Sequence, residues 1–195
     1  MKKFLVIVLM AASLTGVVIS CTDSSVKSDD SVVMTQDSLV KRGQYLVTIM
    51  GCNDCHSPKK MGPRGPEPDP ALLLSGHPAE MPLAPIDLKS TQGWVLFNMN
   101  ATAMVGPWGI SFTANLTSDS TGIGGWSEKQ FFKAIREGKY KGLEDTRMLL
   151  PPMPWQDYAK ASDEDLKAVF AYLKSTKPVK NVVPAAVPPD QIAKQ

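Results

Sequence analysis

The sequence predicts a mostly α-helical domain in which short helices are joined by long, irregular loops. Three segments of the 195-residue chain space their apolar residues like amphipathic helices. The chain also contains 16 prolines and 14 glycines, a frequency that argues against a regular α/β sheet. Its length suits one domain, and a charged fraction of 21% with four tryptophans argues against a wholly disordered chain.

The first predicted helix runs from about Ser38 to Met50, and Asp37 or Ser38 is expected to cap it. Its apolar face follows the helical period, through Leu39, Gly43, Leu46, Val47 and Met50. A glycine on this face indicates that another helix approaches closely there. The alternative is that Gly43 is simply tolerated, at a cost of about 1 kcal/mol.

Two further helices are expected in the second half of the chain. One spans Ser127 to Glu137, with the Ser127/Gln130 spacing of a capping box and Gly138 as its stop. The other spans Ser162 to Ser175, with Ser162 as its N-cap. Its buried face is formed by Leu166, Val169, Phe170 and Leu173.

Two regions between the helices are harder to interpret. The proline-rich segment 57–89 lacks a regular period and is expected to wrap around the domain. Segments 94–97 and 103–105 are expected to pair as a short β-hairpin. The net charge is +2 and no basic block is present, which excludes nucleic acid as a partner.

The N-terminal residues have the pattern of an export signal. Lys2 and Lys3 precede Phe4–Ser20, an uncharged and mostly apolar stretch. It falls short of the roughly 20 residues that a membrane-spanning helix needs, which favours a signal peptide.

The end of this stretch, Val18-Ile19-Ser20-Cys21, resembles the lipobox of bacterial lipoproteins. That resemblance implies a signal peptide at 1–20 and lipidation of Cys21, with an uncleaved anchor as the alternative. Both readings place an exported protein at a membrane, facing the periplasm or the cell exterior. Residues 21–36 then form a flexible tether, 37–177 the domain, and 178–195 a proline-rich tail.

Two of the three cysteines lie in the string Gly51-Cys52-Asn53-Asp54-Cys55-His56. C-x-x-C-H is the attachment signature of c-type haem. Two thiols on one helical turn, Cys52 and Cys55, can add to the two vinyl groups of one porphyrin. His56 then offers an imidazole nitrogen to the iron, a ligand that suits it.

Other uses of this motif fit less well. A thioredoxin-like C-x-x-C belongs in a βαβ context, but the preceding segment is helical. A zinc site needs four ligands, and the only other histidine is His77. A bare disulfide leaves His56 without a role.

Met153 is the candidate for the second axial ligand of the iron. It lies in Pro151-Pro152-Met153-Pro154-Trp155, where prolines stiffen the loop and can hold a weak thioether ligand in place. Met148 is the nearest competitor, although packing is its more ordinary role. His77 reads as a loop histidine whose loop could shield the haem edge.

Several other side chains are candidates for the haem surroundings. Trp108, Trp126 and Trp155 fit either the haem pocket or an ordinary core. Asn115 and Arg136 could bind haem propionates, and a solvated charge on its helix is an equal alternative for Arg136.

A helix entering C-x-x-C-H, a late methionine loop and a terminal helix with Tyr172-Leu173 together resemble the cytochrome c domain. The resemblance covers Ser38 to Thr176. It implies that the first and last helices cross around one haem. Gly43 would be the small residue at that crossing, and the Phe170/Tyr172 pair would supply the aromatic.

A closer resemblance lies in Asn115-Leu116-Thr117, Thr121–Ser127, Ala134–Gly138 and Met153-Pro154. These segments resemble the cytochrome subunits of membrane-bound alcohol dehydrogenases and related multihaem cytochromes. Proteins of that family carry two or three haem motifs, whereas this chain has one. The family's quinone-linked dehydrogenase role is therefore not carried over.

The sequence thus predicts an electron carrier with one covalent haem c and His56 and Met153 as axial ligands. Its partners would be redox proteins that dock transiently, and the chain itself would not be an enzyme. The alternatives are a haem subunit of a larger dehydrogenase or oxidase complex, a peroxidase-like haem enzyme, and a gas-binding haem sensor.

Overall fold

Two helices from opposite ends of the domain, α1 (Gln36–Ile49) and α5 (Asp163–Ser175), cross each other at Gly43. The computed structural model describes residues 34–194, so the signal segment and Cys21 lie outside the described residues. A β-carbon at Gly43 would overlap the carbonyl oxygen of Ala168 and lie 2.7 Å from Tyr172 Cβ. The predicted close approach is confirmed, and Tyr172 is the aromatic residue at the crossing.

Phe170, the other half of the predicted aromatic pair, has a different role. Its ring stacks on Phe131 with the ring centroids 5.1 Å apart. Phe131 belongs to α3 (Glu128–Arg136), so Phe170 joins α5 to α3 rather than to α1.

The helix caps agree with the sequence in two cases out of three. Ser127 Oγ accepts the Gln130 N–H at 3.2 Å, and Ser162 Oγ accepts the Asp165 N–H at 3.0 Å. The expected cap of α1 was wrong. Thr35 caps α1 by accepting the Ser38 N–H, which places Asp37 and Ser38 inside the first turn.

The short elements were mostly not foreseen. The helices α2 (Cys52–His56) and α4 (Trp155–Tyr158) each occupy about one turn. The described residues also contain the 3₁₀ segments η1 (Leu88–Thr91), η2 (Tyr140–Gly142) and η3 (Pro189–Lys194).

In the part of the chain that the structure describes, the strands form two small antiparallel sheets. The predicted hairpin is confirmed by β3 (Leu96–Phe97) pairing with β4 (Ala103–Gly106), but β5 (Gly109–Phe112) extends it to three strands in the order β3-β4-β5. The second sheet pairs β1 (Lys59–Gly62) with β2 (Gly65–Pro68). The proline-rich segment 57–89 therefore contains regular structure at its start.

The core has two parts. A smaller cluster under the three-stranded sheet contains Val105, Ile110 and Ile192. The main cluster lies between the helices, and its buried members are Leu46, Val47, Leu74, Ile123, Phe131, Leu166, Ala168, Val169 and Leu173. Removing such side chains from water is the main source of stability, at about 1.5–3 kcal/mol for each large one.

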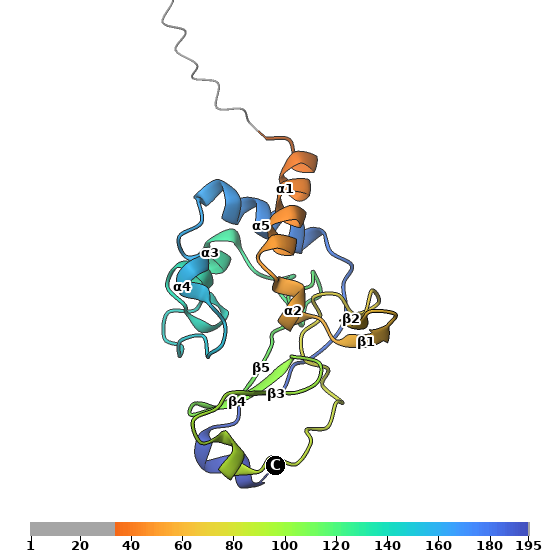
Figure 1. The fold of residues 1–195 in the computed structure, drawn as a ribbon. Coiled ribbons are helices and arrows are strands. Elements are labelled where there is room, and N and C mark those ends of the chain that lie inside the picture. Colours follow the sequence, from red (N-terminus) through yellow and green to blue (C-terminus); the bar gives the residue numbers. More distant parts are fainter. Residues whose placement is uncertain (1–33, 195) are drawn as a thin grey trace, which may run out of the picture. The chain divides into compact units, whose positions relative to one another are not determined.

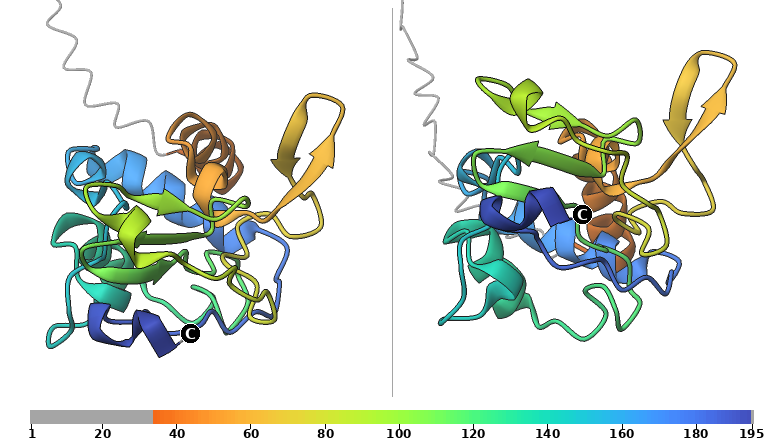
Figure 2. Two further views of the ribbon diagram at one scale, coloured as in Figure 1. Left: turned by 60° about the horizontal axis from the view of Figure 1, so that its bottom comes forward. Right: turned by 90° about the horizontal axis from the view of Figure 1, so that it is seen from below.

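Residues 178–194, called the strap below, run back across the domain after α5. Val187 pairs with Ile110 of β5, and Figures 1 and 2 show η3 lying against the three-stranded sheet. Ile192 of η3 is 9% exposed, so the strap contributes to the smaller core. Among residues 34–194, every helix is too short or too polar to cross a bilayer.

Candidate haem site

The short helix α2 carries Cys52, Cys55 and His56 on little more than one turn. Gly51, with φ of 68°, turns the chain sharply between α1 and α2, a conformation that favours glycine. Both cysteines are free thiols rather than a disulfide. Burial raises the pKa of Cys52 to about 11 and also raises that of Cys55, so both thiols are protonated near neutral pH.

His56 is buried, and its ring is oriented by a hydrogen bond to Ala114. Its Nδ1 lies 2.8 Å from the carbonyl oxygen of Ala114, to which Nδ1–H donates, and this leaves Nε2 for a metal. Burial lowers the pKa of His56, so the ring is neutral, the form that binds iron.

A chain segment around Gly76 supports His56 from behind. The Gly76 N–H donates to the His56 carbonyl at 2.8 Å, and the Leu74 N–H donates to Ser57 Oγ at 2.8 Å. Gly76 has φ of 76°, and a β-carbon there would lie 2.5 Å from the Thr113 carbonyl oxygen. Only glycine fits between the helix that carries His56 and the segment that orients its ring.

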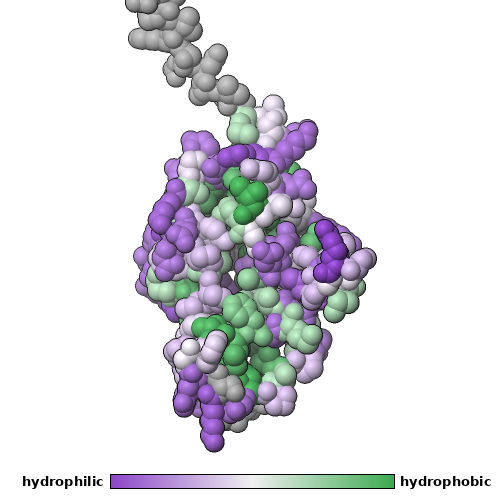
Figure 3. All heavy atoms as spheres, in the orientation of Figure 1, coloured by the Kyte–Doolittle hydropathy of each residue, from purple (hydrophilic) through white to green (hydrophobic). Residues whose placement is uncertain are grey.

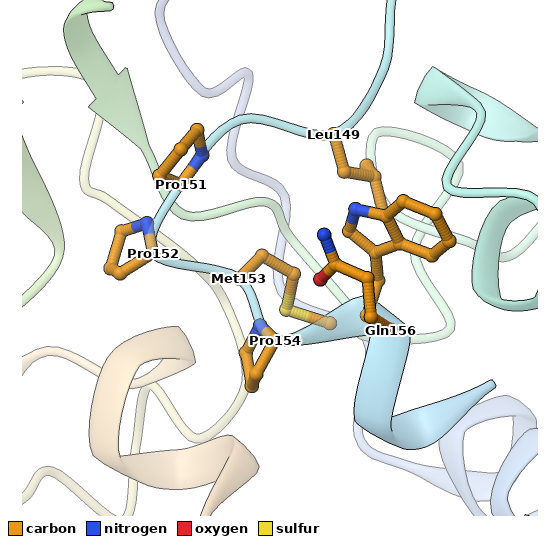
Figure 4. Close-up of a pocket in the computed structure, with 7 residues that line it drawn as sticks. Leu149, Pro151, Pro152, Met153, Pro154 and Gln156 are labelled. Carbon is orange, nitrogen blue, oxygen red and sulfur yellow. The ribbon is translucent and has the colours of Figure 1, made fainter. Parts of the chain in front are cut away.

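Met153 lines a surface pocket of about 240 Å³. The residues that line this pocket lie just before α4 and at the start of that helix. Figure 4 shows the Met153 thioether lying between the side chains of Pro154 and Gln156. The full lining consists of Leu149, Pro151, Pro152, Met153, Pro154, Trp155 and Gln156. The thioether is therefore accessible to a ligand rather than enclosed in the core.

Three hydrogen bonds fix the Met153 loop to other elements. Ser111 Oγ of β5 donates to the Pro151 carbonyl at 2.8 Å, and the Leu149 N–H donates to the Gly138 carbonyl at 2.6 Å. After the methionine, Tyr158 donates to the carbonyl oxygen of Met50 at 2.7 Å. Met50 lies just before the C-x-x-C-H turn, so this last bond ties the methionine segment to the haem motif.

The remaining candidates have other partners. His77 is 1% exposed, its Nδ1 lies 2.9 Å from Thr102 Oγ1, and its ring packs on Phe112. It is a buried histidine in a loop, as expected, and shielding of the haem edge by that loop stays a prediction. Met148 is 43% exposed and pairs with Lys139 in an isolated bridge.

The three candidate tryptophans lie in different environments. Trp155 lines the Met153 pocket, whereas Trp126 packs against the main core. Trp108 covers Gly106 and donates its Nε1–H to Ser111 Oγ at 3.2 Å, so it steadies the serine that holds Pro151.

The two propionate candidates are bonded within the protein. The Asn115 amide donates to Thr121 Oγ1 and to the Val179 carbonyl of the strap. The Arg136 guanidinium pairs with Asp163 at 2.6 Å and donates to the Ala159 carbonyl. These bonds place Asn115 in a buried loop and Arg136 at the α3–α5 junction, and propionate binding by either residue stays a prediction.

Sequence reasoning missed two residues near the motif. Lys59 donates to the Asp54 carbonyl in α2, and Tyr158 donates to the Met50 carbonyl just before α2. Nothing in the sequence distinguishes Lys59 from its neighbour Lys60. Within residues 34–194, no group of three His, Cys, Asp or Glu side chains is placed to hold a metal ion as the zinc alternative requires.

Comparison with known proteins identifies the relatives of this chain, although no family model matches it. The gluconate 2-dehydrogenase cytochrome c subunit of Pantoea cypripedii is 34% identical over 164 residues, 84% of this chain. The cytochrome c subunit of the quinone alcohol dehydrogenase of Gluconobacter oxydans is 28% identical over 73% of this chain. This chain is a relative of dehydrogenase cytochrome c subunits.

The relatives are much longer proteins. The chain spans 28% of the gluconate dehydrogenase subunit and 23% of the alcohol dehydrogenase subunit. The fructose dehydrogenase cytochrome subunit of Gluconobacter japonicus is 28% identical over 72% of this chain, which spans 22% of it. The predicted resemblance to the cytochrome subunits of alcohol dehydrogenases is confirmed.

The candidate haem-binding side chains of this chain have the chemistry that haem c needs. Two free thiols stand on one turn, next to a neutral imidazole whose Nδ1 is occupied and whose Nε2 is not. The Met153 thioether lines a pocket at the start of α4, and Tyr158 of that helix bonds to Met50, two residues before Cys52. These groups are the ones that covalent attachment and axial ligation of a haem require.

Proposed function

We propose that this protein is an electron carrier that holds one haem c, bound through Cys52 and Cys55, with His56 and Met153 as axial ligands. The observation that carries the proposal is the state of His56. It is buried, neutral and oriented by Ala114, on the same turn as two free thiols. A bound haem would supply a metal that gains or loses one electron without any bond to a substrate.

The chain's own contribution is to hold both ligands in place before and after the transfer. The hydrogen bond from Nδ1 to the Ala114 carbonyl fixes the His56 ring, and the bond from Ser111 to Pro151 fixes the start of the Met153 loop. A ligand set that is already oriented needs little rearrangement when the charge changes, which favours fast electron transfer.

The setting follows from the N-terminus and the relatives. We propose that residues 1–20 direct export, that Cys21 is lipidated, and that the protein faces the periplasm or the cell exterior from a membrane. Several acyl chains anchor firmly, at about 0.8 kcal/mol for each buried CH₂. Since the relatives are subunits of dehydrogenases, a haem subunit of a larger dehydrogenase complex is the second candidate function.

Covalent haem is tested on protein made in a host with haem-attachment machinery. We expect a pyridine haemochrome spectrum from the denatured protein and a mass that includes one haem. A mass without haem contradicts the proposal, and a mass with more than one contradicts the stoichiometry.

The sixth ligand is tested with Met153→Ala and the matched control Met148→Ala. The oxidised protein should show the weak red-end band of sulfur-to-iron charge transfer. We expect Met153→Ala to abolish this band and lower the reduction potential, because a thioether raises the potential, and Met148→Ala to do neither. A band that persists in Met153→Ala contradicts the assignment.

The lipid anchor is tested by metabolic labelling with radioactive palmitate. The wild-type chain should incorporate the label and Cys21→Ser should not. Labelling of Cys21→Ser contradicts lipidation at this cysteine but leaves the electron-carrier proposal intact.

A further inference from the structure

The ammonium group of Lys59 closes the carboxyl end of the haem-motif helix. Its Nζ lies 2.8 Å from the Asp54 carbonyl, 3.3 Å from the Asn53 carbonyl and 2.5 Å from the Ser57 carbonyl. The last carbonyls of a helix lack partners within the helix, so a cation at this position satisfies them.

A loop of the three-stranded sheet completes this environment. The Asn100 carbonyl lies 3.2 Å from Lys59 Nζ, and Asn100 Oδ1 accepts the Lys59 backbone N–H at 2.7 Å. Three ammonium hydrogens thus face four carbonyl oxygens and no carboxylate within hydrogen-bonding distance. Dipoles thus hold the charge at hydrogen-bonding distance, while the Asp54 carboxylate attracts it from farther away.

The adjacent lysine is in a different situation. Lys60 Nζ lies 3.8 Å from the Asp69 carboxylate, and the Lys60 side chain is 57% exposed. Successive residues of a strand point to opposite faces, which explains how neighbours in β1 differ so much. Lys60 is therefore a control with the same chemistry and almost the same place in the sequence.

The charge on Lys59 lies beside the groups of the candidate haem site. The Asp54 and Ser57 carbonyls that contact its Nζ flank Cys55 and His56 in the sequence, so the ammonium lies against the turn that carries both residues. A half-buried cation interacts with such neighbours more strongly than a solvated one, because less water screens it.

We propose that Lys59 is a positioning residue of the haem site, whose ammonium closes the end of α2 and whose charge raises the reduction potential of the haem that α2 binds. The inference rests on the proposed function, because it concerns the potential of that haem. Reduction adds one negative charge to the site, so a fixed positive charge beside it stabilises the reduced state relative to the oxidised one.

The test is potentiometry on purified holoprotein of the wild type, Lys59→Gln, Lys60→Gln and Lys59→Arg. Glutamine can still donate hydrogen bonds but carries no charge, and arginine keeps the charge. We expect Lys59→Gln to lower the reduction potential, Lys59→Arg to stay close to the wild type, and Lys60→Gln to leave the potential unchanged. The sulfur-to-iron band should persist in all four proteins, which shows that the ligands are the same.

Equal potentials for Lys59→Gln and Lys60→Gln would overturn the inference. If Lys59→Gln yields no holoprotein, Asn100→Asp replaces it, since aspartate can still accept the Lys59 N–H while placing a carboxylate beside the ammonium. That variant should also lower the potential, and an unchanged potential would overturn the inference. Failure of the proposed function is distinguishable, because the wild type itself would then contain no covalent haem.

Discussion

Tyr158 and Met50, which are more than a hundred residues apart in the sequence, are joined by a 2.7 Å hydrogen bond from the phenol to the backbone carbonyl. Tyr158 ends α4, directly after the Met153 loop, and Met50 caps the carboxyl end of α1, directly before the C-x-x-C-H turn. Burial raises the pKa of Tyr158 to about 12, so the hydroxyl remains a donor at all physiological pH values. One bond therefore connects the two segments proposed to supply the axial ligands.

The first prediction concerns Tyr158→Phe, which keeps the ring and removes the hydrogen bond. Loss of one such bond costs about 1 kcal/mol, which should loosen the Met153 loop. We expect the pH at which hydroxide displaces the thioether to fall by roughly 0.7 unit, since one pH unit corresponds to about 1.36 kcal/mol. The measurement is an alkaline titration of the sulfur-to-iron band.

Tyr45→Phe is the matched control, because Tyr45 is 54% exposed on α1. It should titrate like the wild type. An equal shift in both variants would mean that the Tyr158 bond does not hold the methionine segment.

The second prediction concerns the crossing of α1 and α5. A methyl group at Gly43 would overlap the Ala168 backbone, so Gly43→Ala must push the helices apart. We expect the free energy of unfolding of the holoprotein to fall by about 3 kcal/mol, at the upper end of ordinary overpacking. Urea unfolding followed by circular dichroism measures the loss.

Gly125→Ala is the control for this substitution. A β-carbon at Gly125 would have no atom within 4 Å, and its backbone is not in the left-handed region. Its stability should stay within about 0.5 kcal/mol of the wild type. A similar loss in both variants would show that the helix crossing is not tight at Gly43.

The helices and the haem motif could be predicted because their signals are local. Ser127 and Ser162 cap the helices that follow them, and the apolar period of α1 correctly placed Gly43 at a helix contact. The cap of α1 was missed by a few residues because Thr35, Asp37 and Ser38 are all good N-caps and only the backbone geometry selects one of them.

The remaining features depend on contacts between distant segments. The four residues of β5, Gly-Ile-Ser-Phe, alternate over too short a stretch to predict a strand, and they gain their place by pairing with β4 and with Val187 of the strap. Lys59 differs from Lys60 because both the end of α2 and Asn100 contact it. Tertiary contacts of this kind leave no trace in a window of ten residues.

The third prediction concerns Asn181, by which the strap holds the segment behind His56. Its amide donates to the Ser75 carbonyl at 2.7 Å and to the His77 carbonyl at 2.8 Å. Its Oδ1 accepts the Ala79 N–H at 3.0 Å. Asn181→Ala removes three hydrogen bonds, so we expect a loss of about 2–3 kcal/mol in the free energy of unfolding, with faster amide hydrogen exchange in this segment.

Asn181→Asp separates the two sides of this contact. The aspartate keeps the acceptor for the Ala79 N–H but loses the donors to the Ser75 and His77 carbonyls. Amide hydrogen exchange in this variant should therefore accelerate around Ser75 and His77 and much less at Ala79. Unchanged exchange across 75–79 in Asn181→Ala would contradict a clamping role for the strap.

The last prediction concerns His77 and the pH dependence of stability. Burial lowers the pKa of His77 from its ordinary value of 6.5, although a hydrogen bond to the Met81 backbone opposes the shift. Below about pH 6.5 the unfolded chain therefore takes up a proton that the folded protein does not. The free energy of unfolding should be constant above this pH and fall below it, until the folded pKa is reached.

This dependence is measured by urea unfolding of the holoprotein between pH 5 and 8, with His77→Gln for comparison. One proton gives a slope of at most about 1.4 kcal/mol per pH unit below pH 6.5, and His77→Gln should lack this component whatever its absolute stability. Any contribution from His56 is common to both proteins and cancels in the difference. Parallel curves for the two proteins would show that His77 is protonated equally in the folded and unfolded states, contrary to its burial against Thr102 and Phe112.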